Sequence, residues 1–291
     1  MHVLKTLLAE VKEFKKDSIL TPLFMLLEVA MEMIIPLMMA SIIDEGVNRG
    51  DMHHIFVIGA YMILAALIGL WAGMMGGKYG ARASAGFARN LRKSMFTNIQ
   101  TFSFANIDKY STAGLVTRLT TDVTNLQNAY QMILRMGMRA PASLIVAMCM
   151  SLYISPRLAS VYLLAVLILA AILVFIISRV TKIFDFVFKK YDDLNASVQE
   201  NISGIRVVKA YVREDYEKEK FQKASGNIYK FLLKAERILA CNAPVMMTTI
   251  YTCILLISWM GAKMIVTSTF TTGELMSMLA YCMNILGSLM M

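Results

Sequence analysis

The chain has 291 residues, of which 57% are hydrophobic and only 17% charged, and its mean hydropathy is +0.58. An ordinary soluble domain carries about 25% charged residues, so a soluble chain of this composition has nowhere to bury its apolar surface. The composition indicates a membrane protein and argues against a soluble enzyme, a disordered chain or a disulfide scaffold.

Six apolar runs are long enough to cross about 30 Å of hydrocarbon. Backbone polar groups in lipid must be satisfied within each segment, so we expect all six to be helices. The first apolar run is too long for the core of a cleavable signal peptide, and we expect an uncleaved first span. The six runs cover residues 18–43, 55–77, 137–155, 158–180, 243–266 and 274–291.

The positive charges are distributed unevenly between the two sets of loops. Residues 1–17, 78–139 and 179–240 hold 26 of the 29 lysines and arginines, and the opposite loops hold three. Under the positive-inside rule the basic segments are cytoplasmic, which places the N-terminus in the cytoplasm of a multi-pass protein of the bacterial plasma membrane. The net charge of +9 therefore reports topology, and we expect no nucleic-acid partner.

Residues 1–16 alternate apolar and basic positions with a helical period. Apolar residues such as Leu4, Leu8 and Val11 fall on one side, and four lysines fall on the other. This pattern predicts an elbow helix that lies in the cytoplasmic interface and contacts membrane lipid.

Cysteine and histidine do not form a metal-binding pattern. The four cysteines lie far apart in or beside apolar runs, so we expect buried thiols. His53 and His54 are adjacent and would allow weak metal binding, but we favour their interpretation as two turn residues at a membrane face. We therefore expect no catalytic, cofactor-binding or metal-ligating residues in this chain. The cysteines are Cys149, Cys241, Cys253 and Cys282.

The two long basic segments keep a helical period, which ordinary loops do not. Phe87, Leu91 and Met95 begin one apolar stripe, and Val187, Tyr191 and Leu194 belong to another. The period predicts cytoplasmic stalks over 78–136 and 181–242. A continuous helix from residue 82 to Asp108 would extend about 40 Å beyond the membrane.

Each pair of stalks must reverse at its tip, and both reversals carry apolar residues beside basic ones. The first reversal covers 108–122 and the second 200–215. Apolar groups this far from lipid suggest contact with another protein. The alternative is a plain helix connection whose apolar groups pack on their own stalks, and the pattern alone leaves both open.

Six spans with these two tips resemble the transmembrane domain of ABC exporters, the multidrug, lipid and peptide class. The resemblance covers essentially the whole chain, and two motifs in the appropriate loops are more specific than either alone. The first tip matches the family pattern at Gly114, Arg118, Asp122 and Val123, and the second at Glu200, Gly204, Val208, Lys209, Arg213, Glu214 and Asp215.

The resemblance implies that each tip forms a coupling helix that docks on a nucleotide-binding domain. ATP binding would close two such domains, and the stalks would convert an inward-open cavity to an outward-open one. The first coupling helix would comprise Ala113, Gly114, Leu115, Val116, Thr117, Arg118 and Leu119. The second would comprise Gly204, Ile205, Arg206, Val207, Val208, Lys209, Ala210 and Tyr211.

The chain departs from the family pattern in two ways. It has no GxxxxGK[ST] phosphate-binding loop, since Gly76-Gly77-Lys78 lacks both the leading spacing and the Ser or Thr. It also ends within the sixth apolar run, where the family continues into a stalk and an ATPase domain. We therefore expect a truncated chain or an incomplete gene product, with ATP and Mg²⁺ held by nucleotide-binding domains elsewhere, and no ATP hydrolysis by this chain alone.

Glu28 and Glu32 are four residues apart, on one face near the middle of the first span. An ionised carboxylate there costs about 2.5 to 3.5 kcal/mol, so both should face the bundle interior or water, or be protonated. One hypothesis is that they line a cargo cavity and attract cationic or amphipathic cargo. The alternative is a structural role, in which a neighbouring helix binds them. Arg135 and Arg139, at the cytoplasmic end of the third span, are interpreted as snorkelling residues.

Small residues recur along the second span, including Gly69 and Gly73 at the spacing of a GxxxG motif. Such a stripe lets two helix backbones approach closely, so we predict tight packing against a neighbouring helix.

The prediction is thus an all-α membrane protein with an elbow at 1–16 and a six-helix ABC exporter transmembrane bundle at 17–291. The sixth helix would be truncated, and we expect no nucleotide-binding domain within these residues. With a second exporter subunit, as a homodimer or heterodimer, it would carry hydrophobic or amphipathic small-molecule, lipid or peptide cargo. The alternatives are an ATP-independent channel or secondary transporter, and a non-transporting membrane scaffold.

Overall fold

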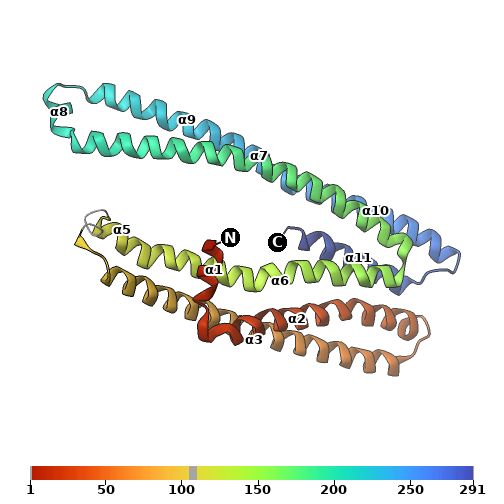
Figure 1. Cartoon of the computed structure of the whole chain (residues 1–291). Coiled ribbons are helices and arrows are strands. Elements are labelled where there is room, and N and C mark those ends of the chain that lie inside the picture. Colours follow the sequence, from red (N-terminus) through yellow and green to blue (C-terminus); the bar gives the residue numbers. More distant parts are fainter. Residues whose placement is uncertain (1, 105–109, 291) are drawn as a thin grey trace. The chain divides into compact units, whose positions relative to one another are not determined.

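The computed structural model describes residues 2–104 and 110–290, and every regular element in those ranges is a helix (Figure 1). The chain forms two compact units, one of Met1–Tyr162 with Ile254–Met291 and one of Leu163–Cys253. The helices are α1 His2–Ala9, η1 Lys12–Phe14, α2 Lys15–Ser41, η2 Ile42–Val47, α3 Met52–Gln100, α5 Thr112–Thr117, η3 Arg118–Asp122, α6 Val123–Ile154, α7 Pro156–Ser203, α8 Ile205–Ala210, α9 Glu214–Ala240, α10 Asn242–Val266 and α11 Thr272–Ser288.

Five helical segments of the described chain are long and apolar enough to cross a membrane. They coincide with the first five predicted runs, which confirms a multi-pass membrane protein. The sixth run corresponds to α11, which has 17 residues and is shorter than these five. The five segments are Lys12–Val47, Met52–Gln100, Thr112–Ile154, Pro156–Ser203 and Glu214–Val266.

The second and fourth spans continue as helices well past their apolar runs. The α3 helix has 49 residues and the α7 helix has 48, whereas about 20 residues cross the hydrocarbon. The first part of each basic segment, up to Gln100 and Ser203, is therefore helical, but the continuous helix expected from residue 82 to Asp108 is not observed, because α3 ends at Gln100.

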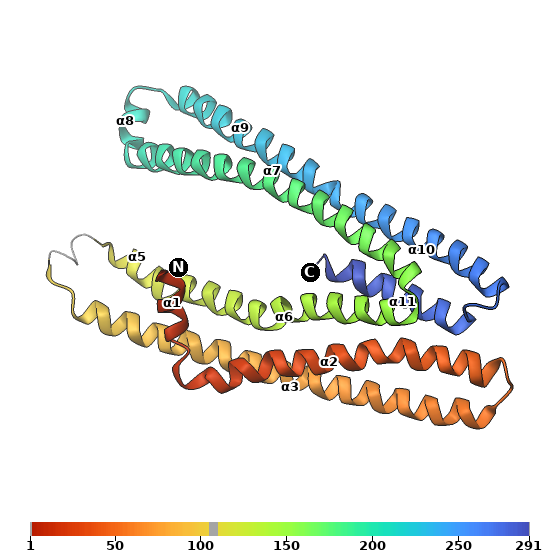
Figure 2. The same cartoon turned by 45° about the vertical axis from the view of Figure 1, so that its right-hand side comes forward.

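In the first unit, α2 and α3 run antiparallel and side by side (Figure 2). The glycine stripe of α3 faces α2: a Cβ added at Gly69 would meet Met31, and one at Gly80 would meet Thr21. The predicted close approach is therefore confirmed, and α2 is the neighbour. Gly77, which has open space beside it, lies off this contact.

At the other end of α2, the π-helical segment η2 holds the beginning of α11. One carboxylate oxygen of Asp44 accepts hydrogen bonds from the Gly273 backbone N–H at 2.9 Å and the Thr272 hydroxyl at 3.4 Å, and the other accepts from the Thr271 hydroxyl at 2.5 Å. A Cβ at Gly273 would collide with the backbone oxygen of Ala40. A carboxylate at a helix N-terminus is favourable because backbone N–H groups and the helix dipole both point toward it. This end of α11 is therefore fixed against α2.

The N-terminal segment is interrupted where a single elbow helix was predicted. A turn at Glu10 and Val11 separates α1 from η1, and Lys12, the first residue of η1, adopts a left-handed backbone with φ of 42°. The turn brings Val11 into a buried cluster with Phe87, Leu91 and Val123 of the α3 and α6 helices. Apolar residues of the elbow therefore pack on protein in addition to any contact with lipid.

The second unit contains the antiparallel pair of α7 and α9, which lie side by side in both views (Figures 1 and 2). Phe186 and Phe231 join the two helices with ring centroids 4.6 Å apart. Nearer the tip, the Asn201 side-chain amide donates to Glu217 Oε2 at 2.9 Å.

Two of the four cysteines depart from the prediction of buried thiols. Cys253 and Cys282 are buried, but Cys149 in α6 and Cys241, between α9 and α10, are exposed. In a membrane helix, an exposed position contacts lipid rather than water, so an apolar run does not by itself imply burial in protein.

Candidate functional site

The first tip is the beginning of a longer helix. Ser111 precedes α5, and its hydroxyl oxygen accepts from the Gly114 backbone N–H at 3.1 Å, a typical N-cap. The α5 helix passes through the π-helical turn η3 directly into α6. The predicted coupling helix at 113–119 therefore lies in α5 and the beginning of η3, in one continuous helical path with α6, while Asp108 and Lys109 lie outside the described residues.

Side chains of α3 tether this tip. Arg92 donates to the Leu119 backbone oxygen at 3.2 Å and to the Thr124 hydroxyl at 3.1 Å. The guanidinium of Arg118 lies 5.4 Å from the centre of the Tyr110 ring. Val116 is left 54% exposed. The first tip thus exposes the apolar side chain of Val116, and Arg92 of α3 holds the neighbouring backbone in place.

The second tip contains a separate short helix. Gly204 ends the path of α7, and α8 follows for six residues over Ile205–Ala210. Val212 then takes a left-handed backbone with φ of 52°, and the Arg213 N–H donates to the Val208 oxygen at 3.0 Å. The predicted coupling segment 204–211 therefore coincides with a helix that is bounded on both sides.

The second tip exposes more apolar surface than the first. A cavity of about 370 Å³ opens beside it between the ends of α7 and α9, with Val198, Ile205 and Phe221 in its wall. Of the two hypotheses for these tips, packing on the stalks accounts for partly buried residues such as Val208, whereas the exposed ones are free to meet another surface. The exposed apolar side chains are Ile202, Ile205, Val207, Tyr211 and Val212.

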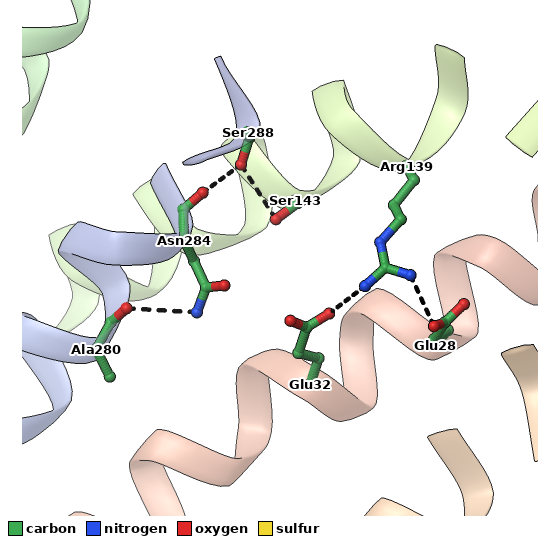
Figure 3. Close-up of polar contacts among 7 residues, drawn as sticks. All are labelled: Glu28, Glu32, Arg139, Ser143, Ala280, Asn284 and Ser288. Carbon is green, nitrogen blue, oxygen red and sulfur yellow. Dashed lines mark hydrogen bonds and ion pairs between the residues drawn. The ribbon is translucent and has the colours of Figure 1, made fainter. Parts of the chain in front are cut away.

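Within the first unit, Arg139 of α6 lies between the two acids of α2 (Figure 3). Its Nη1 is 2.7 Å from Glu28 Oε1, and its Nη2 is 3.0 Å from Glu32 Oε2. One guanidinium therefore serves two carboxylates, which leaves the three groups with one excess negative charge. This triad matches the geometry of the structural alternative, in which a neighbouring helix binds the acids.

The triad has unused hydrogen-bonding capacity. Glu28 Oε2 is buried and has no hydrogen-bond partner among residues 2–104 and 110–290. A Cβ added at Gly73 of α3 would lie 3.2 Å from this carboxylate, so the absence of a side chain there makes room for it. One turn further along α6, the hydroxyl oxygens of Ser288 and Ser143 lie 3.3 Å apart and join α11 to the same helix (Figure 3).

A groove of about 340 Å³ lies beside the triad, between α2 and α6. Met25, one turn before Glu28, and Arg139 both line it, so the groove and the ion pairs are adjacent. The remaining lining residues are Asn128, Gln131, Met132, Arg135 and Met136.

The sequence interpretation missed the pairing of Arg139, which it assigned to snorkelling. The available signal was the charge balance within the spans, since two acids in one span call for a cation in another. In the described part of the chain, no group of three or more histidine, cysteine or acidic residues is arranged to hold a metal ion.

Comparison with known families settles the class of the protein. The model of the ABC transporter transmembrane region matches residues 18–289. The chain belongs to this family. The matched residues include both tips and the triad, so these features all lie within the ABC transporter transmembrane region.

Relatives of the chain are ABC transporter proteins of bacteria. An uncharacterized ABC transporter ATP-binding protein of Bacillus subtilis, YfiB, is 33% identical over 92% of this chain and 47% of its own length. Rv1273c of Mycobacterium tuberculosis, with the same description, is 28% identical over 99% and 50%. An ATP-dependent lipid A-core flippase of Hahella chejuensis is 24% identical over 75% and 38%. The chain spans about half the length of the first two relatives.

Proposed function

We propose that this chain is the membrane-spanning part of an ATP-driven exporter that moves hydrophobic or amphipathic cargo by alternating access. The observation that carries the proposal is the second tip, where a bounded short helix presents Val207 and Tyr211. Gly204 lies roughly 24 residues beyond the apolar run, about 36 Å along a helix. Apolar side chains that far from lipid suit a protein partner.

The proposal includes an orientation and a domain plan. Residues 1–16 form the elbow and 17–291 the transmembrane domain, with α11 as the membrane part of a sixth helix. The stalks at 78–136 and 181–242 lie on the cytoplasmic side of a bacterial plasma membrane. The charge asymmetry, 26 of 29 basic residues on that side, supports this orientation.

The two tips act as the coupling helices, 113–119 and 204–211, and dock on nucleotide-binding domains. Those domains hold ATP and Mg²⁺ and perform the hydrolysis. This chain transmits their closure, because each tip is attached to a long helix that continues into the membrane. A second exporter subunit, identical or different, completes the pathway.

The cargo cavity is proposed to include Glu28 and Glu32. Both acids lie in the first span, with an adjacent groove whose methionines can adapt to apolar ligands of different shapes. The name of the Hahella relative, a lipid A-core flippase, agrees with amphipathic cargo in this family.

The test uses the complete transporter in lipid vesicles, with ATP hydrolysis and cargo transport measured together. Val207→Asp places a charge at the proposed docking surface, and we expect cargo transport to fall at least about tenfold, since charges at an interface core are strongly unfavourable. Tyr229→Asp, at an exposed position on α9, is the control and should transport normally.

Equal transport by wild type and Val207→Asp would refute the docking role of the second tip. Transport that continues without ATP would instead favour an ATP-independent channel or secondary transporter.

A further inference from the structure

The triad of Glu28, Glu32 and Arg139 raises a question of selectivity. A ligand that approaches the two carboxylates meets a guanidinium already bound there, at 2.7 Å and 3.0 Å. We propose that Arg139 is an internal counter-ion that competes with lipophilic cations for Glu28 and Glu32 and thereby sets the cargo affinity. The inference rests on the proposed function, because it assigns these acids to the cargo site.

The charge balance favours a cationic ligand. Two carboxylates share one guanidinium, and a negative charge in a membrane span is costly unless it is compensated. Glu28 Oε2 is buried without a partner in the described chain, so the site offers an acceptor that Arg139 does not use. An added cation beside the two carboxylates can compensate the excess charge.

The adjoining groove supplies room for the apolar part of such a ligand. Met25, Met132 and Met136 line it, and thioether side chains adapt to varied apolar shapes. Arg135 lines the same groove and repels a cation, so the ligand's charge should lie at the Glu28 end and its apolar body beside the methionines.

Arg139 can yield its position because it is not enclosed. Its side chain is 31% exposed, compared with 21% for Glu28, and it projects from α6 on a flexible stem. When a ligand cation takes the carboxylates, the guanidinium can move into the groove. Cargo binding would then weaken the ion pairs between α2 and α6 and so loosen the contact between two spans.

The decisive experiment measures equilibrium binding of tetraphenylphosphonium to the complete transporter in nanodiscs without ATP. The double variant Glu32→Gln with Arg139→Gln keeps the triad's net charge at one negative but frees Glu28 from its competitor. We expect it to bind the cation at least about fivefold more tightly than wild type, since the ion pair no longer has to be broken. Unchanged or weaker binding by this variant overturns the inference, because net charge alone then accounts for affinity.

Three further variants isolate the competition. Arg139→Lys retains a competing cation and should stay within about threefold of wild type. Arg135→Gln removes a positive charge that contacts neither acid, and its gain should be smaller than that of the double variant. With both acids changed to Gln, Arg139→Gln relieves only the direct repulsion of the cation by Arg139, so its gain should be smaller than that of the double variant over wild type. An equal gain there overturns the inference.

Tetraphenylborate, an anion of nearly the same size and shape, is the matched probe. Its binding should not tighten in the double variant, and an equal gain for both ions would show a general opening of the groove and overturn the inference. Because binding is measured without ATP, a transporter that fails the transport test can still show the affinity shift. Failure of the proposed function and failure of this inference are therefore distinguishable.

Discussion

The two tips of this ABC transporter transmembrane region have different local structures. At the first, α5 begins at a side-chain cap and continues into α6, and Arg92 binds it to α3. At the second, α8 is bounded by Gly204 and by the left-handed Val212, and Asn201 bonds to Glu217 across its base. The first tip is continuous with the α6 helix, and the second is a separate short helix held by a small number of contacts.

The difference concerns how each tip would transmit a force. A tip that shares backbone hydrogen bonds with its rod moves together with that rod. A tip bounded by two breaks can open locally at a lower free-energy cost than the rods beside it. We therefore expect hydrogen exchange to be slower in the first tip than in the second.

Loss of the base contact should have the largest effect. Asn201→Ala removes a hydrogen bond to a carboxylate, a contact of about 1.5 to 3 kcal/mol, so exchange across 203–213 should accelerate by about tenfold or more. Hydrogen exchange with mass spectrometry measures this. Asn227→Ala, at an exposed α9 position, is the control. Equal acceleration in the first tip would contradict the independence of the two tips.

Removal of the cap should affect the first tip alone. Ser111→Ala removes the acceptor for the Gly114 N–H, which costs about 1 kcal/mol and should accelerate exchange over 112–117 by about fivefold. Ser203→Ala, at an exposed serine near the second tip, should leave α8 unchanged because Gly204 caps it without a side chain. An unaffected α5 in Ser111→Ala would mean that Arg92 alone holds the first tip.

Relief of backbone strain at Val212 should make hydrogen exchange in the second tip slower and closer to that in the first. Val212 is 81% exposed and left-handed, so Val212→Gly loses little packing and removes a steric cost of about 1 to 2 kcal/mol. Glycine also raises the entropy of the unfolded chain, which offsets part of this gain. We therefore expect the free energy of local opening of α8, measured by hydrogen exchange, to rise by less than about 1 kcal/mol. Val207→Gly, the same change inside α8, should instead reduce protection by roughly 0.3 to 0.5 kcal/mol. Protection that falls in both would contradict strain at Val212.

The smallest effect concerns the contact that anchors the N-terminal segment to α3. Glu10 pairs with Lys12 and accepts from the Ser94 hydroxyl of α3, both at 2.8 Å. The hydrogen bond from Lys12, aided by the one from Ser94, holds the pKa of Glu10 below its ordinary value. The unfolded chain therefore binds this proton more readily than the folded one.

The sign of the pH effect follows from this shift. The stabilisation by Glu10 should be complete above its unfolded pKa of about 4.3 and be lost as the pH falls through the lower folded pKa. Glu10→Gln should remove this acid sensitivity from α1 protection measured between about pH 3 and pH 6. A wild-type response that persists in Glu10→Gln would assign it to another group.

Local patterns predicted the positions of the helices because apolar length and helical period depend on nearby residues. The first span was predicted at 18–43 and α2 covers Lys15–Ser41, and the fifth was predicted at 243–266 and α10 covers Asn242–Val266. The continuity of α3 beyond its span was predicted in the same way.

Features that depend on tertiary contacts were not predictable from those patterns. The turn at Glu10 and Val11 interrupts an intact helical period because burial of Val11 against Phe87 outweighs the local preference. The pairing of Arg139 depends on which faces α2 and α6 turn toward each other, and the spacing of residues within each span does not determine that.

The length of α3 has a mechanical consequence. With 49 residues in one unbroken helix, α3 is about 70 Å long, so each degree of tilt about its middle displaces each end by about 0.6 Å. The glycine contacts with α2 lie near the middle of α3. If α3 tilts about these contacts, it moves little against α2 there, while both of its ends are displaced. A rotation of about five degrees at the contact between α2 and α3 therefore displaces the ends of α3 by about 3 Å.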